Sequence, residues 1–125
     1  MFDDFEVISA YTRAQAIEDG MLIDVSETAK EASIRFPVAI TSALWNGYVV
    51  PSEHDVKTQG QSVEGRLWDT LYLFAIAARG FRGNQLQYRV GYVVNGQLKA
   101  ITVKSLVGPG DHMEPVITLM LLNED

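Results

Sequence analysis

The residues best suited to chemistry in this chain lie in two short segments, one around Arg66 and one around His112. In the second segment, Asp111, His112 and Glu114 supply oxygen and nitrogen groups of the kind that bind a metal ion. The set is incomplete, because structural zinc takes four ligands and the other histidine, His54, lies in a separate segment. A turn whose acids cap backbone amides explains the same residues, and we predict no metal and no cofactor.

Asp69 is the acid in the most unusual position, because it belongs to an apolar helical segment. A carboxylate on a deeply packed helix is costly unless it is paired, and Arg66 lies three residues away along that helix. A structural ion pair between Arg66 and Asp69 is the simpler interpretation. The alternative is a small enzyme or ligand-binding domain whose pocket is formed by Arg66, Asp69, Asp111, His112 and Glu114.

No complete catalytic constellation accompanies these side chains. The chain has no cysteine, which excludes thiolate zinc sites, disulfides and cysteine nucleophiles together. No Gly-x-Ser-x-Gly elbow is present, and the Gly-Pro-Gly-Asp sequence of residues 108–111 lacks the lysine and hydroxyl of a phosphate loop. Enzymatic activity is unsupported by these motifs, and a binding function is favoured.

The net charge of -6 is unevenly distributed, with acids concentrated in residues 1–31 and bases in residues 66–110. Such polarity steers partners, although ordinary solvated charge explains the same pattern. Tyr88 and Tyr92 lie in the basic part but alternate with aliphatic residues, so we expect them in the core and expect no direct nucleic-acid binding. The acids that we expect to contact a basic protein partner are Asp3, Asp4, Glu18 and Asp19.

The N-terminal part of the chain is expected to form short helices. Thr12 and Gln15 have the spacing of a capping box, and Gly20 supplies the end of that helix. Residues 21–25 alternate enough to form a short strand or an extended linker. Ser26 then begins a second short helix.

Residues 34–61 allow two interpretations in their first half. Pro37 suits the first turn of a helix over residues 38–46, whereas the alternation of residues 34–40 suits an extended segment. The Ala-Leu-Trp sequence at residues 43–45 favours the helix. Residues 47–61 have few apolar side chains and are expected to form a long loop.

The C-terminal half carries the clearest patterns. A helix is expected over residues 62–79, with Ser62 as its cap and an apolar face that belongs in the core. Strands are expected over residues 86–94, 98–106 and 115–122, and Asn95-Gly96 has the sequence of a tight hairpin turn. The whole chain, residues 1–125, is therefore expected to be one α+β domain. In it, N-terminal short helices and one long central helix pack on a C-terminal antiparallel three-stranded meander.

Neither a secretion signal nor a membrane span is expected. The first six residues are acidic where a signal peptide is basic, and the most apolar run, residues 71–78, is far shorter than the ~20 residues that cross a bilayer. Together with the missing cysteines, this predicts a location in the cytoplasm of the host cell.

The chain resembles a widespread family of small uncharacterised bacterial proteins, often found on plasmids, phages and other mobile elements. The motifs that carry the resemblance lie at residues 11–20, 22–26, 36–41, 43–45, 65–69, 108–111 and 114–118. The resemblance transfers no catalytic residue. It implies a non-enzymatic protein-binding accessory of a mobile element. The most specific function that it implies is inhibition of a host defence system of the CRISPR or restriction type. A homodimer formed through Trp45, Trp68 and the apolar helix is a further expectation.

Overall fold

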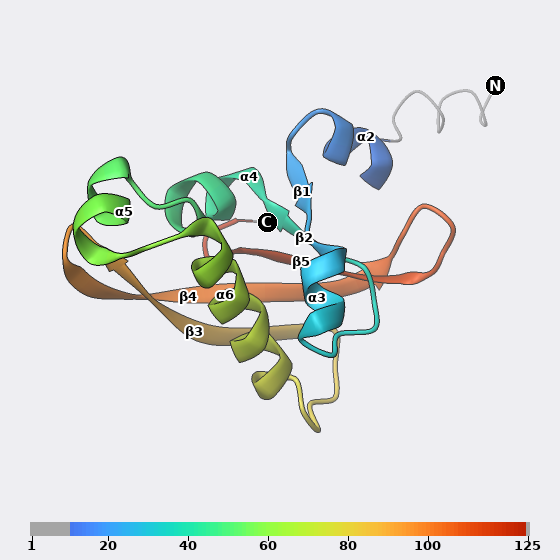
Figure 1. The fold of residues 1–125 in the computed structure, drawn as a ribbon. Helices are drawn as coiled ribbons and strands as arrows, with labels where there is room; N and C mark the ends of the chain where they lie inside the picture. Colours follow the sequence, from blue (N-terminus) through green and yellow to red (C-terminus); the bar gives the residue numbers. More distant parts are fainter. Residues whose placement is uncertain (1–10, 125) are drawn as a thin grey trace.

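A computed structural model of the protein describes residues 11–124 (Figure 1). The predicted partner-binding residues Asp3 and Asp4 lie outside the described residues. The helical elements are α2 (Arg13–Glu18), α3 (Ser26–Glu31), α4 (Ser42–Leu44), the π-helical turn η1 (Trp45–Val49), α5 (Glu53–Gln59) and α6 (Val63–Ala77). The strands are β1 (Leu22–Asp24), β2 (Val38–Thr41), β3 (Gln85–Val94), β4 (Gln97–Pro109) and β5 (Pro115–Leu121).

The strands form one five-stranded mixed sheet in the order β1-β2-β5-β4-β3. Strands β3, β4 and β5 are consecutive antiparallel neighbours, so the predicted meander exists. The prediction did not include two strands of this sheet. Strand β2 pairs with β5 in parallel, and β1 pairs with β2 in antiparallel orientation. The α+β class is thus confirmed, and its sheet is larger than the C-terminal meander.

The predicted helix over residues 38–46 is wrong in its first half. Residues Val38–Thr41 form β2, whose first three side chains are fully buried. A strand with neighbours on both sides and burial on both faces has a continuous apolar sequence, which resembles that of a buried helix. Helix begins only at Ser42, after the cap Thr41, whose hydroxyl accepts a hydrogen bond from the amide of Leu44.

The predicted loop over residues 47–61 is also more ordered than its composition indicates. Within it, α5 is capped by Ser52, whose hydroxyl accepts a hydrogen bond from the amide of Asp55 at 3.1 Å. Gly60 ends the helix in the left-handed conformation, with φ of 64°. Cap and stop signals were therefore present although the apolar pattern was weak.

The long helix α6 begins after its predicted Ser62 cap and ends at Ala77, two residues before the predicted end. The Ser62 hydroxyl accepts a hydrogen bond from the amide of Gly65 at 3.0 Å, and Gly80 follows the last turn with positive φ. The inner face of α6 buries Leu67, Leu71 and Phe74 against the sheet. In Figure 1, α6 lies over β3 and β4, while α3 covers the part of the same face nearer to β5.

The β3–β4 hairpin turns at Asn95-Gly96 as predicted, because both residues have positive φ, 53° and 77°. Register places Tyr88, Val90 and Tyr92 on the face beneath α6, and all three are buried. The prediction that both tyrosines belong to the core is confirmed. Within residues 11–124, no helix combines the length and apolarity that crossing a bilayer requires.

Candidate functional site

Arg66 is a buried structural hub. Its guanidinium donates hydrogen bonds to the carbonyl oxygen of Tyr48 at 2.7 Å, to the carbonyl oxygen of Val93, and to the Gln61 side chain at 3.1 Å. Its nearest anion is Asp55 on α5, with Nη2 and Oδ2 3.8 Å apart. Arg66 therefore connects η1, α5, α6 and the end of β3.

The predicted pairing of Arg66 with Asp69 is wrong. The Asp69 side chain is exposed, whereas Asp55 is buried beside the guanidinium. Residues three apart are neighbours on a helix surface, but here the guanidinium is buried and the carboxylate is not. Arg66 points under α6 toward the hairpin, and Asp69 points into solvent.

Asp55 is held as a carboxylate by the hairpin. The amide of Asn95 donates to its Oδ2 at 2.9 Å, and this bond is the main reason that the pKa of Asp55 lies below its ordinary value. Arg66 lowers that pKa further. Asp55 and Arg66 thus fix the hairpin turn against α5 and α6, which is a structural role.

A second buried network joins α6 to β3. The hydroxyls of Thr70 and Tyr92 lie 2.7 Å apart, and the Tyr88 hydroxyl donates to the carbonyl oxygen of Thr70 at 2.8 Å. Burial raises the pKa of Tyr92 to about 12 and that of Tyr88 well above its ordinary value. Both phenols are therefore neutral hydrogen-bonding groups that fix the helix on the sheet.

The Asp111–Glu114 turn caps α2. The Asp111 carboxylate accepts hydrogen bonds from the amides of Ala14 and Arg13, at 3.0 and 2.8 Å, and these bonds hold its pKa below the ordinary value. Glu114 accepts from the backbone amide of His112 at 2.9 Å. Within residues 11–124, no three histidine, cysteine or acidic side chains are grouped as metal ligands would be.

The Arg13 side chain ties this turn to the sheet. Its guanidinium donates to the Thr118 hydroxyl at 2.8 Å and to the carbonyl oxygen of Ile117 at 2.7 Å. Burial lowers the pKa of Arg13, and the carboxylates of Asp24 and Asp111 oppose that shift. A small hollow of about 190 Å³ lies between these groups and the His112 turn.

The structure does not bring the two halves of the predicted polar site together. Arg66 contacts Val93, which pairs with Leu98 near the start of β4, whereas Asp111 follows Pro109 at the end of that strand. A strand rises about 3.3 Å per residue, so the two groups are on the order of 35 Å apart. The buried Arg66, the exposed Asp69 and the Asp111–Glu114 turn therefore do not form one site.

Glu18 and Asp19, the described members of the predicted acidic partner surface, lie at the end of α2 and are exposed. The hydroxyl of Tyr11 donates to Asp19 at 2.7 Å, which raises the pKa of Tyr11. Helix α2 packs beside β1, at the sheet edge opposite to β3 (Figure 1). These acids are therefore distant from the exposed face of α6.

That face of α6 carries three large apolar side chains at successive helical turns. Trp68, Tyr72 and Ile76 are 37%, 44% and 40% exposed, and the first two rings stack with centroids 5.8 Å apart. Their spacing of four residues places them in one row along the helix. We call this row the α6 stripe. The sequence indicated it, because the second half of the helix is apolar nearly all round.

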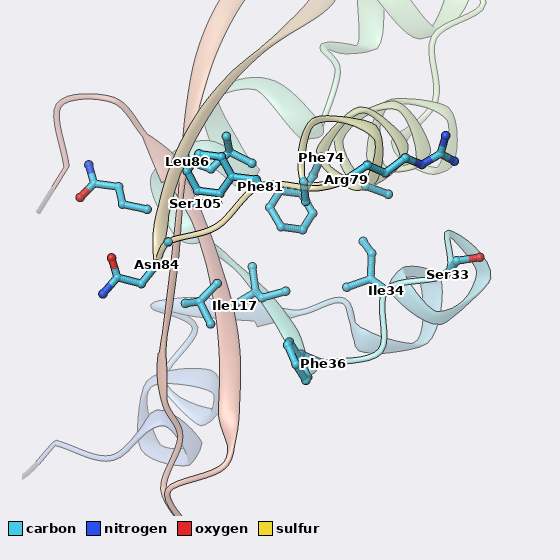
Figure 2. Close-up of a pocket in the computed structure, with 15 residues that line it drawn as sticks. Ser33, Ile34, Phe36, Phe74, Arg79, Phe81, Asn84, Leu86, Ser105 and Ile117 are labelled. Carbon is cyan, nitrogen blue, oxygen red and sulfur yellow. The ribbon is translucent and has the colours of Figure 1, made fainter.

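A cavity of about 420 Å³ lies at the other end of the fold, beneath the last turn of α6 (Figure 2). Sequence reasoning missed it, since its walls come from four separate stretches of chain. Apolar side chains predominate in the lining, which includes Ile34, Phe36, Phe74, Phe81, Leu86 and Ile117. The polar members include Ser33, Arg79, Asn84, Gln85 and Ser105.

The fold and these sites define a small α+β domain whose clustered polar groups hold its elements together and whose central helix presents an apolar row. The chain belongs to the family of unknown function DUF6573, whose profile matches residues 1–125. The resemblance to an uncharacterised family is confirmed at that level. No curated protein and no solved structure matches the chain.

Proposed function

We propose that this protein is a non-enzymatic binding protein that docks a partner protein through the α6 stripe. The observation that carries the proposal is the exposure of Trp68, Tyr72 and Ile76 in one row on the best-packed helix of the fold. Aromatic side chains held by a rigid element are the usual anchors of protein interfaces, because they bury a large area at a small cost in side-chain entropy.

The fold itself does not require large apolar groups at these positions. Leu67, Leu71 and Phe74 already fill the inner face of α6. Burying the exposed apolar area of the stripe in a partner is favourable by about 25 cal/mol per Å². Apolar side chains spaced one helical turn apart are recognised when one face of the helix binds in a hydrophobic groove of the partner protein.

The charges beside the stripe indicate the chemistry of the partner. Glu64 precedes Trp68 by one helical turn and Asp69 follows it directly, and both acids are exposed. A partner groove with apolar walls and a basic rim at this end complements both features. The overall charge of -6 favours the approach of such a basic surface.

We further propose that the partner belongs to a host defence complex, of the CRISPR or restriction type, and that the protein serves a mobile element in a bacterial cytoplasm. This rests on the family resemblance. The use of Arg66, Asp55 and Asp111 in structural contacts supports a binding role over a catalytic one.

The test compares three forms of the protein as bait in lysate of a bacterial host. The Trp68→Ala/Tyr72→Ala variant removes the anchors of the stripe. The Leu98→Ala variant removes an apolar side chain that is still more exposed, at 75%, from the opposite face of the sheet. We expect one protein to be retained by the wild type and by Leu98→Ala and lost with the double variant. Equal recovery by all three forms would overturn the α6 stripe as the docking surface.

Three further measurements separate the alternatives. Light scattering after size exclusion detects a second copy as the occupant, in which case wild type is dimeric and the double variant monomeric. Charge reversal of Glu18 together with Asp3 and Asp4 tests the acidic surface, which predicts salt-sensitive loss of capture. Plating of phage on cells that produce the protein tests the defence target, and unchanged restriction would remove it from the proposal.

A further inference from the structure

We propose that the cavity beneath the last turn of α6 binds a small aromatic carboxylate that carries a hydrogen-bonding group at its far end. This site is separate from the α6 stripe, which lies on the outer side of the same helix. Figure 2 shows the cavity between α6, the α3–β2 connection and the sheet.

The walls of the cavity fit a flat apolar body. Phe74 comes from α6, Phe81 from the segment after it, and Phe36 from the connection before β2. Ile117 contributes from the sheet on the opposite side (Figure 2). Aromatic rings pack favourably against other rings in offset or edge-to-face arrangements, so three phenylalanines favour an aromatic ligand.

Ser105 supplies a polar group deep inside the cavity. It is 1% exposed, and its register opposite Leu86 and Leu119 places its side chain on the face that α6 covers. Among the residues that the structure describes, its hydroxyl has no hydrogen-bond partner, unlike those of Thr70, Tyr88 and Tyr92. Because Ser105 lines the cavity, a ligand that enters can hydrogen-bond to this hydroxyl and gain that interaction.

The lining of the cavity includes one cation, Arg79, and no acid, although the chain as a whole is acidic. Arg79 lines the cavity at the end of α6 and is exposed. Arg35 and Arg82 stand next to lining residues, and the segments 32–40 and 78–87 contain no acid. Arg79 makes no ion pair with another described residue. A carboxylate at the mouth is therefore complemented by charge.

The size of the cavity limits the ligand. A volume of 420 Å³ lies within the range of small-molecule sites and holds roughly a dozen water-sized groups at about 30 Å³ each. A phenol ring joined to a short carboxylate chain has about that many non-hydrogen atoms. Such a molecule reaches Ser105 with its phenolic hydroxyl while its carboxylate remains beside Arg79.

Calorimetric titration with three related probes tests the proposal. These are 3-(4-hydroxyphenyl)propanoate, 3-phenylpropanoate, which lacks the hydroxyl, and 4-(2-aminoethyl)phenol, which replaces the acid with a cation. We expect one site per chain for the first probe and binding about 3–10-fold weaker for the second. For the amine we expect no measurable binding.

Two variants assign the contacts. Arg79→Gln is expected to weaken both acids, by up to about fivefold for an exposed ion pair, while Arg89→Gln on the opposite face of the sheet leaves them unchanged. Ser105→Ala is expected to abolish the difference between the two acids, which a purely structural serine would not do. The proposal is overturned if neither acid binds the wild type, if the amine binds as tightly, or if the two acids bind the wild type equally. The probe series keeps the test decisive even if a variant folds poorly.

Discussion

The guanidinium of Arg66 and the carboxylate of Asp55 lie 3.8 Å apart in the interior, although their residues belong to different helices. Around them, the carbonyl oxygens of Tyr48 and Val93 accept from the arginine, and the amide of Asn95 donates to the aspartate. One ion pair therefore holds η1, both helices and the hairpin turn together. Its environment is closed, which is why we assign it to folding.

Replacing Arg66 by Met is expected to destabilise the fold strongly. The substitution leaves the Asp55 carboxylate buried without its cation and leaves the two backbone carbonyls without donors. Urea unfolding measures the effect. Asp69→Asn is the control, with a change within about 0.5 kcal/mol, because its side chain is exposed. Equal stability of the Arg66 variant and the wild type would contradict the structural role.

Alkaline pH is expected to unfold the protein through its buried tyrosines. Burial raises the pKa of Tyr92 to about 12, whereas the same group in the unfolded chain titrates near pH 10. A raised folded pKa gives stability that is complete below the unfolded pKa and is lost as pH rises through the folded one. The loss between these values is about 1.4 kcal/mol per pH unit for one tyrosine.

Urea unfolding at several values between pH 8 and 12 checks this dependence. Tyr92→Phe is expected to flatten it, and to cost about 1 kcal/mol at neutral pH through the lost bond to Thr70. Tyr72→Phe is the matched control, because Tyr72 is 44% exposed and should leave the slope unchanged. A slope that is the same in all three proteins would refute the assignment to Tyr92.

Asp111→Ala is expected to loosen α2 without unfolding the domain. The variant removes the acceptor of the Arg13 and Ala14 amides, while the sheet keeps its own hydrogen bonds. Hydrogen exchange should become faster at those two amides and stay unchanged at Gly65, whose amide is capped by Ser62. Because the folded pKa of Asp111 is lowered, wild-type α2 should also loosen as pH falls through that pKa. Protection that is independent of residue 111 would argue against the cap.

Gly96→Ala is expected to cost about 1–2 kcal/mol, because φ is 77° at this position and a Cβ disfavours that conformation. Gly47→Ala is the comparison. Its φ lies outside the left-handed region and a Cβ there meets nothing within 4 Å, so alanine should be neutral or slightly stabilising. Thermal unfolding of both variants measures the two changes in stability. The difference between them separates the strain at positive φ from the effect of replacing any glycine.

Elements with local signals were predictable. The Ser62 cap, the Thr12–Gln15 capping box and the Asn95-Gly96 turn each require only neighbouring residues, and all three are present. Strand β2 was not predictable in the same way. It is stabilised by a parallel partner, β5, from the far end of the sequence, and its continuous apolar run is common to strands and buried helices.

The candidate sites depended still more on tertiary structure. The pairing of Arg66 with Asp55 requires α5, which lies in a stretch whose composition resembles a loop. Ser105 belongs to an ordinary strand pattern, and only the register shows that its hydroxyl faces the covered side of the sheet. The α6 stripe was visible in the sequence, although which side of an almost wholly apolar helix remains exposed was not.

The position of β5 in the middle of the sheet has a consequence for synthesis in the cell. Until residues 115–121 have been made, β2 and β4 lack the strand that lies between them, and each presents an open edge. Open edges pair with other chains, so a nascent or truncated product that ends before β5 is exposed to aggregation and proteolysis. Only a chain that extends through β5 can therefore close its sheet.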